Sequence, residues 1–189
     1  TKETENFNNY LKTIAKQINQ IENLVNEFSD FARMPKPIFD MNNIIEIVKS
    51  NISLLSEINQ SISIKFNYNK KDLLIKCDSE QMSRVLFNLI KNSIESIQEK
   101  TKKNGDFAKI IDIEIIEKND YITLNITDNG TGFSKDNIKN ITKPYFTTKP
   151  KGSGLGLSIV NKIINDHNGS IKFSSNANGA KVVINLPNN

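Results

Sequence analysis

The chain is organised around two glycine-rich stretches, Asp128-Asn-Gly-Thr-Gly-Phe133 and Gly152-Ser-Gly-Leu-Gly-Leu157. We call them the first and the second glycine turn. Glycine lets a backbone approach a flat base or a phosphate closely. A predicted strand, 121–127, precedes the first turn, so the acceptor-only carboxylate of Asp128 suits the exocyclic amine of adenine. A predicted helix, 155–166, follows the second turn, and the free N–H groups at a helix start favour phosphate. The two turns therefore predict a nucleotide site.

Two asparagines precede these turns in a helix predicted from Asp78 or Ser79, as N-cap, to about residue 100. Asn88 and Asn92 are four residues apart and share a face of this helix. A carboxamide oxygen is a hard ligand that suits Mg²⁺, which takes further ligands from water and phosphates. Taken alone, the pair is better explained as exposed polar residues. Beside the two glycine turns, a metal and phosphate role is favoured.

The remaining pattern predicts an α/β fold. An amphipathic helix is expected at 42–56, strands are expected at 61–68 and 73–77, and 102–106 is expected to form a polar turn. Two hairpins are expected, one from 109–117 and 121–127 and one from 170–175 and 180–186 around Asn178-Gly179. This order predicts a two-layer α/β sandwich with a sheet rich in antiparallel pairs.

Residues 1–34 predict one long helix with a heptad seam. Such a seam requires partner helices, and Pro35 and Pro37 then break the helix sharply. The alternative is a helix packed on its own domain; the bundle is favoured. The sequence thus predicts two units, 1–36 from a dimerisation bundle and 37–189 as the nucleotide-binding domain. The seam consists of Phe7, Leu11, Ile14, Ile18, Ile21, Val25, Phe28 and Ala32.

Composition narrows the function classes. A chain of 189 residues with 37% hydrophobic and 24% charged content is typical of a globular protein with one good core. The net charge of +4 comes from scattered lysines, so nucleic-acid binding is not expected. The single cysteine, Cys77, excludes an internal disulfide framework and fits a reducing compartment. No apolar run reaches membrane-spanning length.

Four motifs in order resemble those of the GHKL (Bergerat) ATP-binding fold of sensor histidine kinases. The two glycine turns resemble its glycine boxes. Asn88-Leu-Ile-Lys-Asn-Ser-Ile-Glu95 resembles its asparagine box, and Pro144-Tyr-Phe-Thr-Thr-Lys149 resembles its phenylalanine box. The run from Glu27 to Pro37 is similar to that of the nitrogen-regulation (NtrY-like) type.

The resemblance implies phosphoryl transfer from ATP·Mg²⁺ to a histidine on a helix that is not in this chain. Asn88, Lys91 and Asn92 would be catalytic, with Asn92 as the Mg²⁺ ligand. The implied partners are ATP, the phospho-acceptor helix of a parent kinase, a response regulator receiver domain and a second copy in a homodimer. The implied location is cytoplasmic, in a parent protein that inner-membrane segments can anchor. The expected ATP-binding residues are Asn88, Asn92, Asp128, Gly130, Gly132, Phe146, Thr147, Thr148, Lys149, Gly152, Ser153, Gly154, Leu155 and Gly156.

Three other functions were weighed. A hydrolytic GHKL ATPase would carry a catalytic glutamate where this chain has Asn88, which accepts no proton at neutral pH. A non-catalytic dimerisation module is opposed by the intact motifs, and an anti-sigma-type serine kinase by the helix at 1–34. His167, the only histidine, precedes Asn168-Gly169 and is predicted to be structural.

The segment between the turns is predicted to act as a lid. Residues 134–153 are expected to become ordered slowly on nucleotide binding, with Lys149 or Lys151 contacting phosphate. Tyr145 and Phe146 are alternatively expected to pack on the helix bundle. Glu95 is interpreted as an ordinary surface or motif residue rather than a general base.

Overall fold

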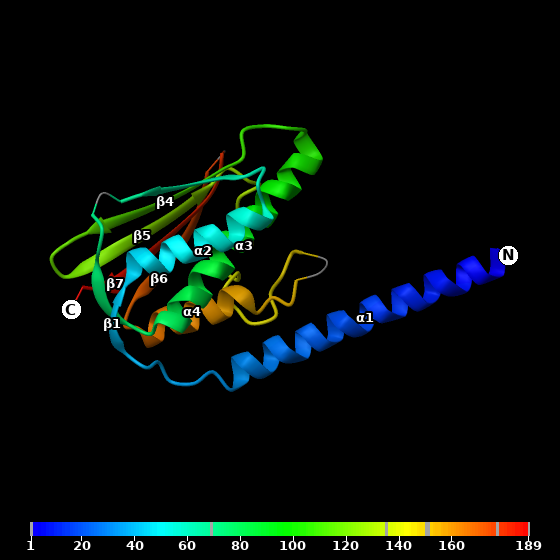
Figure 1. The fold of residues 1–189 in the computed structure, drawn as a ribbon, viewed down its shortest axis with the longest axis horizontal. Coiled ribbons are helices and arrows are strands. Elements are labelled where there is room, and N and C mark those ends of the chain that lie inside the picture. The colour runs from blue at the N-terminus through cyan, green and yellow to red at the C-terminus, as the bar shows by residue number, and fades with distance from the viewer. Residues whose placement is uncertain (1, 69, 135, 150–151, 177, 189) are drawn as a thin grey trace.

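The computed structural model describes residues 2–68, 70–134, 136–149, 152–176 and 178–188. It places helices against one face of a sheet, with a long helix reaching away from this sandwich (Figure 1). The elements are α1 (Lys2–Ala32), β1 (Asp40–Asn43), α2 (Ile44–Ile58), β2 (Ser63–Asn67), β3 (Leu74–Cys77), α3 (Ser79–Asn104), β4 (Ile110–Glu117), β5 (Tyr121–Asp128), α4 (Gly156–Asp166), β6 (Ser170–Asn176) and β7 (Gly179–Pro187).

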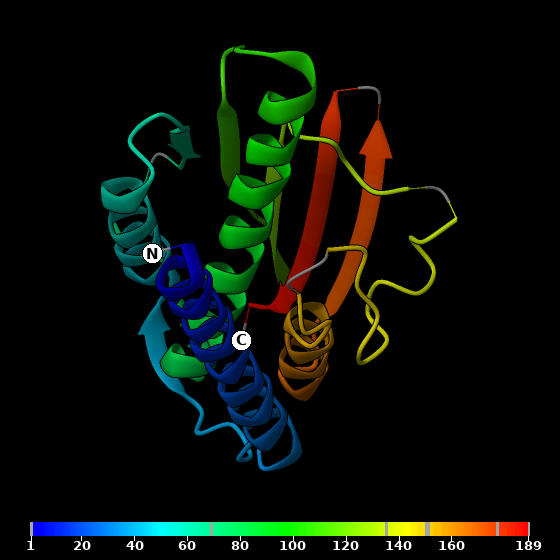
Figure 2. The same cartoon turned by 90° about the vertical axis from the view of Figure 1, so that its right-hand side faces the viewer.

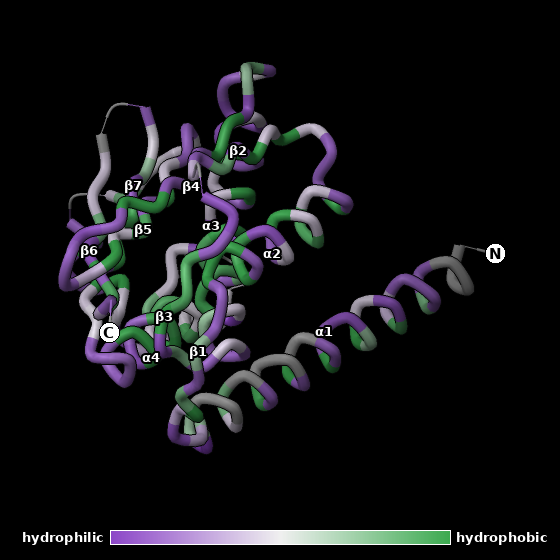
Figure 3. Tube along the Cα trace, turned by 60° about the vertical axis from the view of Figure 1, so that its left-hand side comes forward, coloured by the Kyte–Doolittle hydropathy of each residue, from purple (hydrophilic) through white to green (hydrophobic). Residues whose placement is uncertain are grey.

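The main sheet confirms the predicted two-layer α/β sandwich. Its five strands have the order β2-β4-β5-β7-β6, and every pair except β2–β4 is antiparallel. Alternate residues of β4 and β5, among them Ile113 and Ile126, are paired and buried. They face the helices, so the apolar core lies between the two layers (Figure 2). Hydrophobic residues accordingly gather on the elements of the sandwich (Figure 3).

A second, two-stranded sheet was not predicted. β1 pairs antiparallel with β3, with Asp40 opposite Cys77 and Asn43 opposite Leu74. The strand 73–77 was expected, but β1 was missed because Asp-Met-Asn-Asn carries no hydrophobic alternation. Its structure comes from the partner strand and from the Asn42 amide, which donates to the Cys77 carbonyl at 2.8 Å.

The helix α3 is longer than the sequence predicted. Residues 102–104, expected in a polar turn, continue the helix, which ends at Gly105 with φ of +81°. At the other end, the Asp78 carboxylate accepts from the Gln81 amide at 3.0 Å, which confirms Asp78 as the N-cap. The predicted end of α3 was wrong because lysine and asparagine occur in both helices and turns. The helix ends only where Gly105 takes a positive φ.

His167 is a structural residue, as predicted. Its ring is buried, Nε2 accepts from the Asp78 amide at 3.0 Å, and Nδ1 lies 2.8 Å from the Ile163 carbonyl. An amide donor at Nε2 requires the proton on Nδ1, so both ring nitrogens are occupied. Phe39 packs edge-on against the ring at 5.1 Å. The ring thereby joins the end of α4 to the start of α3 and to the segment before β1.

The helix α1 presents its seam to solvent. Seven seam residues, Phe7 to Phe28, are 47–61% exposed, and Figures 1 and 3 show the helix extending past the sandwich. A described contact joins the two: the rings of Phe28 and Tyr145 stack at 6.4 Å. The sequence left two alternatives for α1, a helix bundle and packing along its own domain. Among the described residues, packing along its own domain is not observed. No described helix is long and apolar enough to cross a membrane.

Candidate nucleotide site

The first glycine turn lies directly on α3. A Cβ on Gly130 would stand 2.3 Å from Ser96 Oγ and 2.7 Å from the Ser96 carbonyl carbon. Only glycine permits this approach of one backbone to another. The Thr131 amide then donates to Ser96 Oγ at 3.0 Å. The turn after β5 is therefore held against the middle of α3, next to the asparagine motif.

Asp128 is buried where β5 meets this turn. Its Oδ1 accepts from the Gly130 amide at 2.9 Å and from the Ala180 amide at 3.4 Å. The Ser93 side chain also hydrogen-bonds to the carboxylate. A carboxylate offers about four acceptor sites. Three described donors leave capacity for one more, such as an exocyclic amine.

Burial governs the protonation of this carboxyl. Removal from water raises the pKa of Asp128 above its ordinary value, although the Gly130 amide, the Ser93 hydroxyl, the Ala180 amide and the Lys100 charge each lower it. A buried carboxylate that must remain charged gains from an additional donor. A hydrogen-bond donor on a ligand would therefore stabilise the charged form of Asp128.

The far side of the first turn is fixed to the last hairpin. Gly132 has φ of +72°, and a Cβ there would lie 2.2 Å from Ser175 Oγ. Ser175 Oγ accepts from the Phe133 amide at 3.0 Å. The Phe133 and Phe173 rings pack edge to face at 5.7 Å. The base end of the candidate site is therefore held between α3 and β6.

The second glycine turn brings α4 against the asparagine motif. A Cβ on Gly156 would stand 3.0 Å from Asn88 Oδ1, and Asn88 Nδ2 donates to the Arg84 carbonyl at 2.8 Å. At the N-terminus of α4 the Leu155 amide donates to Ser153 Oγ at 3.2 Å, and no side chain of the described residues caps the helix, so amides of its first turn can donate to a ligand. Asn88 is therefore placed beside the turn that the sequence assigned to phosphates.

Asn92, one turn further along α3, is joined to the segment between the glycine turns. We call residues 136–149 the lid segment. Lys149 Nζ donates to Asn92 Oδ1 at 3.1 Å and forms an ion pair with Glu95. Lys91 is exposed on the same helix. The structure thus places Lys149 at the asparagine motif, and Lys151 lies outside the described residues.

The lid segment packs on the second turn through glycine. Gly154 has φ of +73°, and a Cβ there would stand 2.5 Å from the Tyr145 carbonyl carbon. Tyr145 itself has φ of +65°, and its ring stacks on Phe28 of α1. A Cβ on Gly152 would come closer than 3.0 Å to one atom, the Thr147 hydroxyl oxygen at 2.6 Å. Tyr145 therefore contacts α1 of its own chain, while the packing of Tyr145 and Phe146 on a helix bundle stays a prediction.

The donor set limits which metal the site can hold. The described residues contain no cluster of three or more His, Cys, Asp or Glu side chains that could bind a metal alone. One amide oxygen, Asn92 Oδ1, already faces a cation in the form of the Lys149 ammonium. Such an oxygen fits Mg²⁺, which takes its other ligands from water and phosphate.

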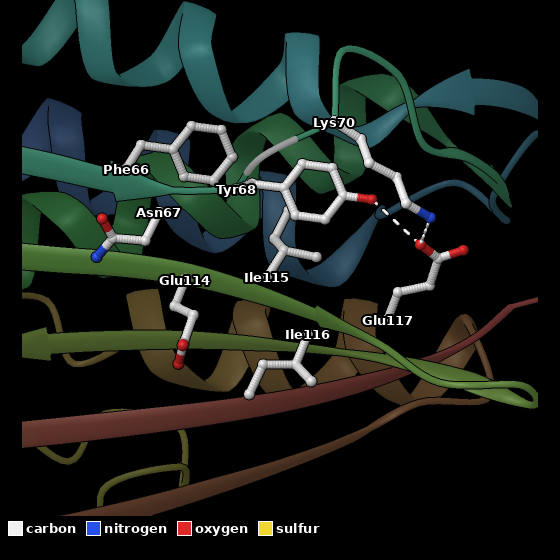
Figure 4. Close-up of a pocket in the computed structure, with 8 residues that line it drawn as sticks. All are labelled: Phe66, Asn67, Tyr68, Lys70, Glu114, Ile115, Ile116 and Glu117. Atoms are coloured by element: carbon white, nitrogen blue, oxygen red, sulfur yellow. Dashed lines mark hydrogen bonds and ion pairs between the residues drawn. The ribbon is translucent and has the colours of Figure 1, made fainter.

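A surface hollow lies elsewhere. About 740 Å³ in volume, it opens at the β2–β4 edge of the sheet (Figure 4). There Lys70 and Tyr68 both point toward Glu117. It contains none of the sequence-predicted site residues. The hollow is lined by Phe66, Asn67, Tyr68, Lys70, Glu114, Ile115, Ile116 and Glu117.

Three serines were missed by the sequence reasoning. Ser93 and Ser96 project from α3 toward Asp128 and the first turn, and Ser175 reaches the same turn from β6. The signal for the first two was available, because they follow Asn92 at positions on the inner side of the helix. Ser175 carried no signal, since its neighbour is distant in sequence.

Comparison with known proteins agrees with this arrangement. An NtrY-like sensor histidine kinase of Rickettsia conorii is 38% identical over 184 residues, covering 97% of this chain and 30% of that protein. This chain therefore spans about a third of the length of that relative. The nucleotide-free catalytic domain of histidine kinase ThkA superposes with a TM-score of 0.70 at 27% identity, covering 80% of this chain and 96% of that one.

A longer solved structure extends the likeness to α1. Histidine kinase ThkA in complex with the response regulator TrrA has a TM-score of 0.76 at 25% identity, covering 95% of this chain and 51% of that one. The family described as histidine kinase-, DNA gyrase B- and HSP90-like ATPase matches residues 77–189. These residues hold α3, both glycine turns and the whole β4–β7 arrangement. The chain therefore belongs to the histidine kinase-, DNA gyrase B- and HSP90-like ATPase family and resembles its NtrY-like sensor kinases.

Proposed function

We propose that this chain is the ATP-binding catalytic part of an NtrY-like sensor histidine kinase. It transfers the γ-phosphate of ATP to a histidine outside this chain, and the phosphate then passes to an aspartate of a response regulator. The observation that carries the proposal is the convergence on one stretch of α3. Asp128 and the first turn meet it at Ser93 and Ser96, while the second turn and Lys149 meet it at Asn88 and Asn92.

The base and the phosphates would bind at opposite ends of this stretch. Asp128 would accept from the adenine amine, and Gly130 and Gly132, packed on Ser96 and Ser175, would hold the turn beside the base. Backbone amides at the start of α4 would donate to phosphate, with support from Phe146, Thr147 and Thr148 of the lid segment. The second glycine turn that would surround the phosphates consists of Gly152, Ser153, Gly154, Leu155 and Gly156. In this assignment the acceptor Asp128 faces the base, and the amide donors at the start of α4 face the phosphates.

The asparagine motif would serve the transferred phosphate. Asn92 would hold Mg²⁺, with Asn88 beside it and Lys91 or Lys149 reaching a phosphate oxygen. When bound, Mg²⁺ neutralises charge that develops on the β- and γ-phosphates. Catalysis would then consist mainly of positioning and charge stabilisation. Hydrolysis is disfavoured, because Asn88 cannot act as a base and Glu95 is paired with Lys149.

The acceptor must come from elsewhere. The one histidine of the chain, His167, is buried and occupied at both nitrogens. The exposed seam of α1 would complete a helix bundle with the phospho-acceptor helix and a second copy, so that residues 1–36 form the dimerisation unit and 37–189 the catalytic one. The solved complex of ThkA with a response regulator supports a receiver domain as the final partner. We expect ATP to be the phosphoryl donor and the reaction to take place in the cytoplasm.

Phosphorylation in trans tests this function. The chain is incubated with radiolabelled ATP, alone and with a full-length kinase of the same parent that carries an inactivated ATP site. We expect no self-labelling, and we expect label on the added kinase that is labile in acid and stable in base. Self-labelling of the chain that is abolished in the His167→Gln variant would contradict the proposal. So would free phosphate released faster than label appears on the acceptor.

A further inference from the structure

A lysine from the lid segment bridges two residues of α3. Lys149 Nζ donates to Asn92 Oδ1 at 3.1 Å and pairs with the Glu95 carboxylate. Asn92 and Glu95 are three residues apart and lie on neighbouring turns of one helix face. The ammonium therefore sits at the amide oxygen to which the proposed function assigns Mg²⁺.

The backbone of the lid segment sets this position. The Lys149 amide donates to Thr147 Oγ1 at 3.0 Å, and the Gly152 amide donates to the Lys149 carbonyl at 3.1 Å. The Phe146 amide donates to the Lys143 carbonyl at 3.2 Å. These short-range bonds form a compact turn that aims Lys149 at α3. Gly154 packs on the backbone of this turn, and Lys149 is the side chain through which the lid segment reaches Asn92 and Glu95 of α3.

We propose that Lys149 is a latch that holds the lid segment on the asparagine motif until Mg·ATP displaces it. The inference rests on the proposed function and specifies how access to that same site is regulated. An ammonium and a Mg²⁺ ion on the same amide oxygen would be two cations a few ångströms apart, and they would repel each other. Binding of the metal with its nucleotide therefore releases Lys149 from Asn92. The freed ammonium then pairs with the incoming phosphates.

Glu95 is the positioning residue of this latch. Its charge holds the ammonium near Asn92, since the amide oxygen alone is a weak partner for a cation. Lys149 and Glu95 are 38% and 37% exposed, and water screens such a pair. The latch therefore biases an equilibrium between closed and open positions of the lid segment by a modest factor and does not lock it.

The Glu95→Gln variant tests the latch, with Glu99→Gln as its matched control. Glu99 lies one turn further along α3 and pairs with Lys103 on the surface, so both changes remove one negative charge from the same helix. Hydrogen exchange of the Phe146 and Lys149 amides is followed by NMR without nucleotide. We expect exchange about fivefold faster in Glu95→Gln and unchanged in Glu99→Gln, because an exposed ion pair contributes up to about that factor. Amides of β5 should not change in either variant.

Calorimetry provides the second measurement. Without the competing anchor, Glu95→Gln should bind ATP in the presence of Mg²⁺ a few-fold more tightly than the original chain and the control. Exchange equal in the two variants, with normal ATP binding, would contradict the latch alone. Faster exchange combined with weaker Mg·ATP binding would also overturn it, because Glu95 would then position Lys149 in the bound state. A chain that binds no ATP would contradict the proposed function together with the latch.

Discussion

The two ends of the candidate nucleotide site are built differently. At the base end, Asp128 is buried, and the first glycine turn contacts the backbone of α3. At the phosphate end, Gly154 packs the lid segment on the second glycine turn, but the lid segment is joined to α3 by the partly exposed ion pair of Lys149 and Glu95. The rigid end suits a base that never changes during a reaction. The weakly held end suits phosphates whose bonds change and a metal that must enter and leave.

Alanine at equivalent glycines of the two ends should give the largest contrast. Gly130→Ala places a methyl group 2.7 Å from the Ser96 carbonyl carbon, which belongs to backbone that cannot rotate away. We expect the free energy of unfolding to fall by about 3 kcal/mol and ATP binding to be lost. Gly152→Ala meets the Thr147 hydroxyl, which can rotate, so the loss should stay below about 0.5 kcal/mol.

Urea unfolding of both variants measures this contrast. Equal losses of stability at the two glycines would mean that the base end is no more rigid than the phosphate end.

Asp128→Asn should weaken ATP binding without a comparable loss of stability. The amide oxygen can still accept from Gly130, but the charge that favours the adenine amine is lost. We expect a cost of about 2 kcal/mol in ATP binding, measured by calorimetry. The control is Asp112→Asn on the opposite, solvent-facing side of the sheet. ATP and GTP affinities that are equal in the original chain would refute the adenine role.

The same variant should change the pH dependence of stability. In the folded chain burial raises the pKa of Asp128, whereas in the unfolded chain the carboxyl titrates near its ordinary value. Between these two pKa values the folded chain binds more protons than the unfolded one. The free energy of unfolding should therefore fall as pH rises through this window. Asp128→Asn should flatten that part of the curve, as urea titrations at several pH values would reveal.

Asn92→Ala tests the phosphate end alone. We expect ATP binding in the presence of Mg²⁺ to weaken by about 1.5 kcal/mol, because the Asn92 side-chain oxygen no longer binds the metal ion. Adenosine binding should stay nearly unchanged. Calorimetry with and without Mg²⁺ separates the two. If Mg²⁺ increases the ATP affinity of the variant as much as that of the original chain, the metal is bound by another residue.

The smallest effect is expected where α1 touches the lid segment. The rings of Phe28 and Tyr145 are both about half exposed and stack at 6.4 Å. Phe28→Ala should change ATP affinity by less than about 0.5 kcal/mol. A larger change would show that α1 controls the phosphate end through Tyr145, and the two ends would then differ in their connection to the helix as well as in rigidity.

The sequence alone predicted the order of the main helices and strands and a set of candidate site residues. Hydrophobic alternation predicted β4 and β5, the heptad pattern predicted α1, and glycine spacing located both turns. These features are local, because side-chain periodicity and the conformational freedom of glycine act within a few residues. The same local character explains why the end of α3 was misplaced, since lysine and asparagine fit helix and turn equally well.

Tertiary structure alone decided which groups meet. β1 exists because β3 pairs with it, and no periodicity of its own predicts it. Ser175 reaches the first glycine turn from a strand 42 residues away, and Lys149 reaches Asn92 across 57 residues. Contacts over such separations depend on how the layers pack and on where one glycine admits a neighbouring backbone. The candidate site residues were therefore named from the sequence, whereas the contacts that hold each end of the candidate site were set by the fold.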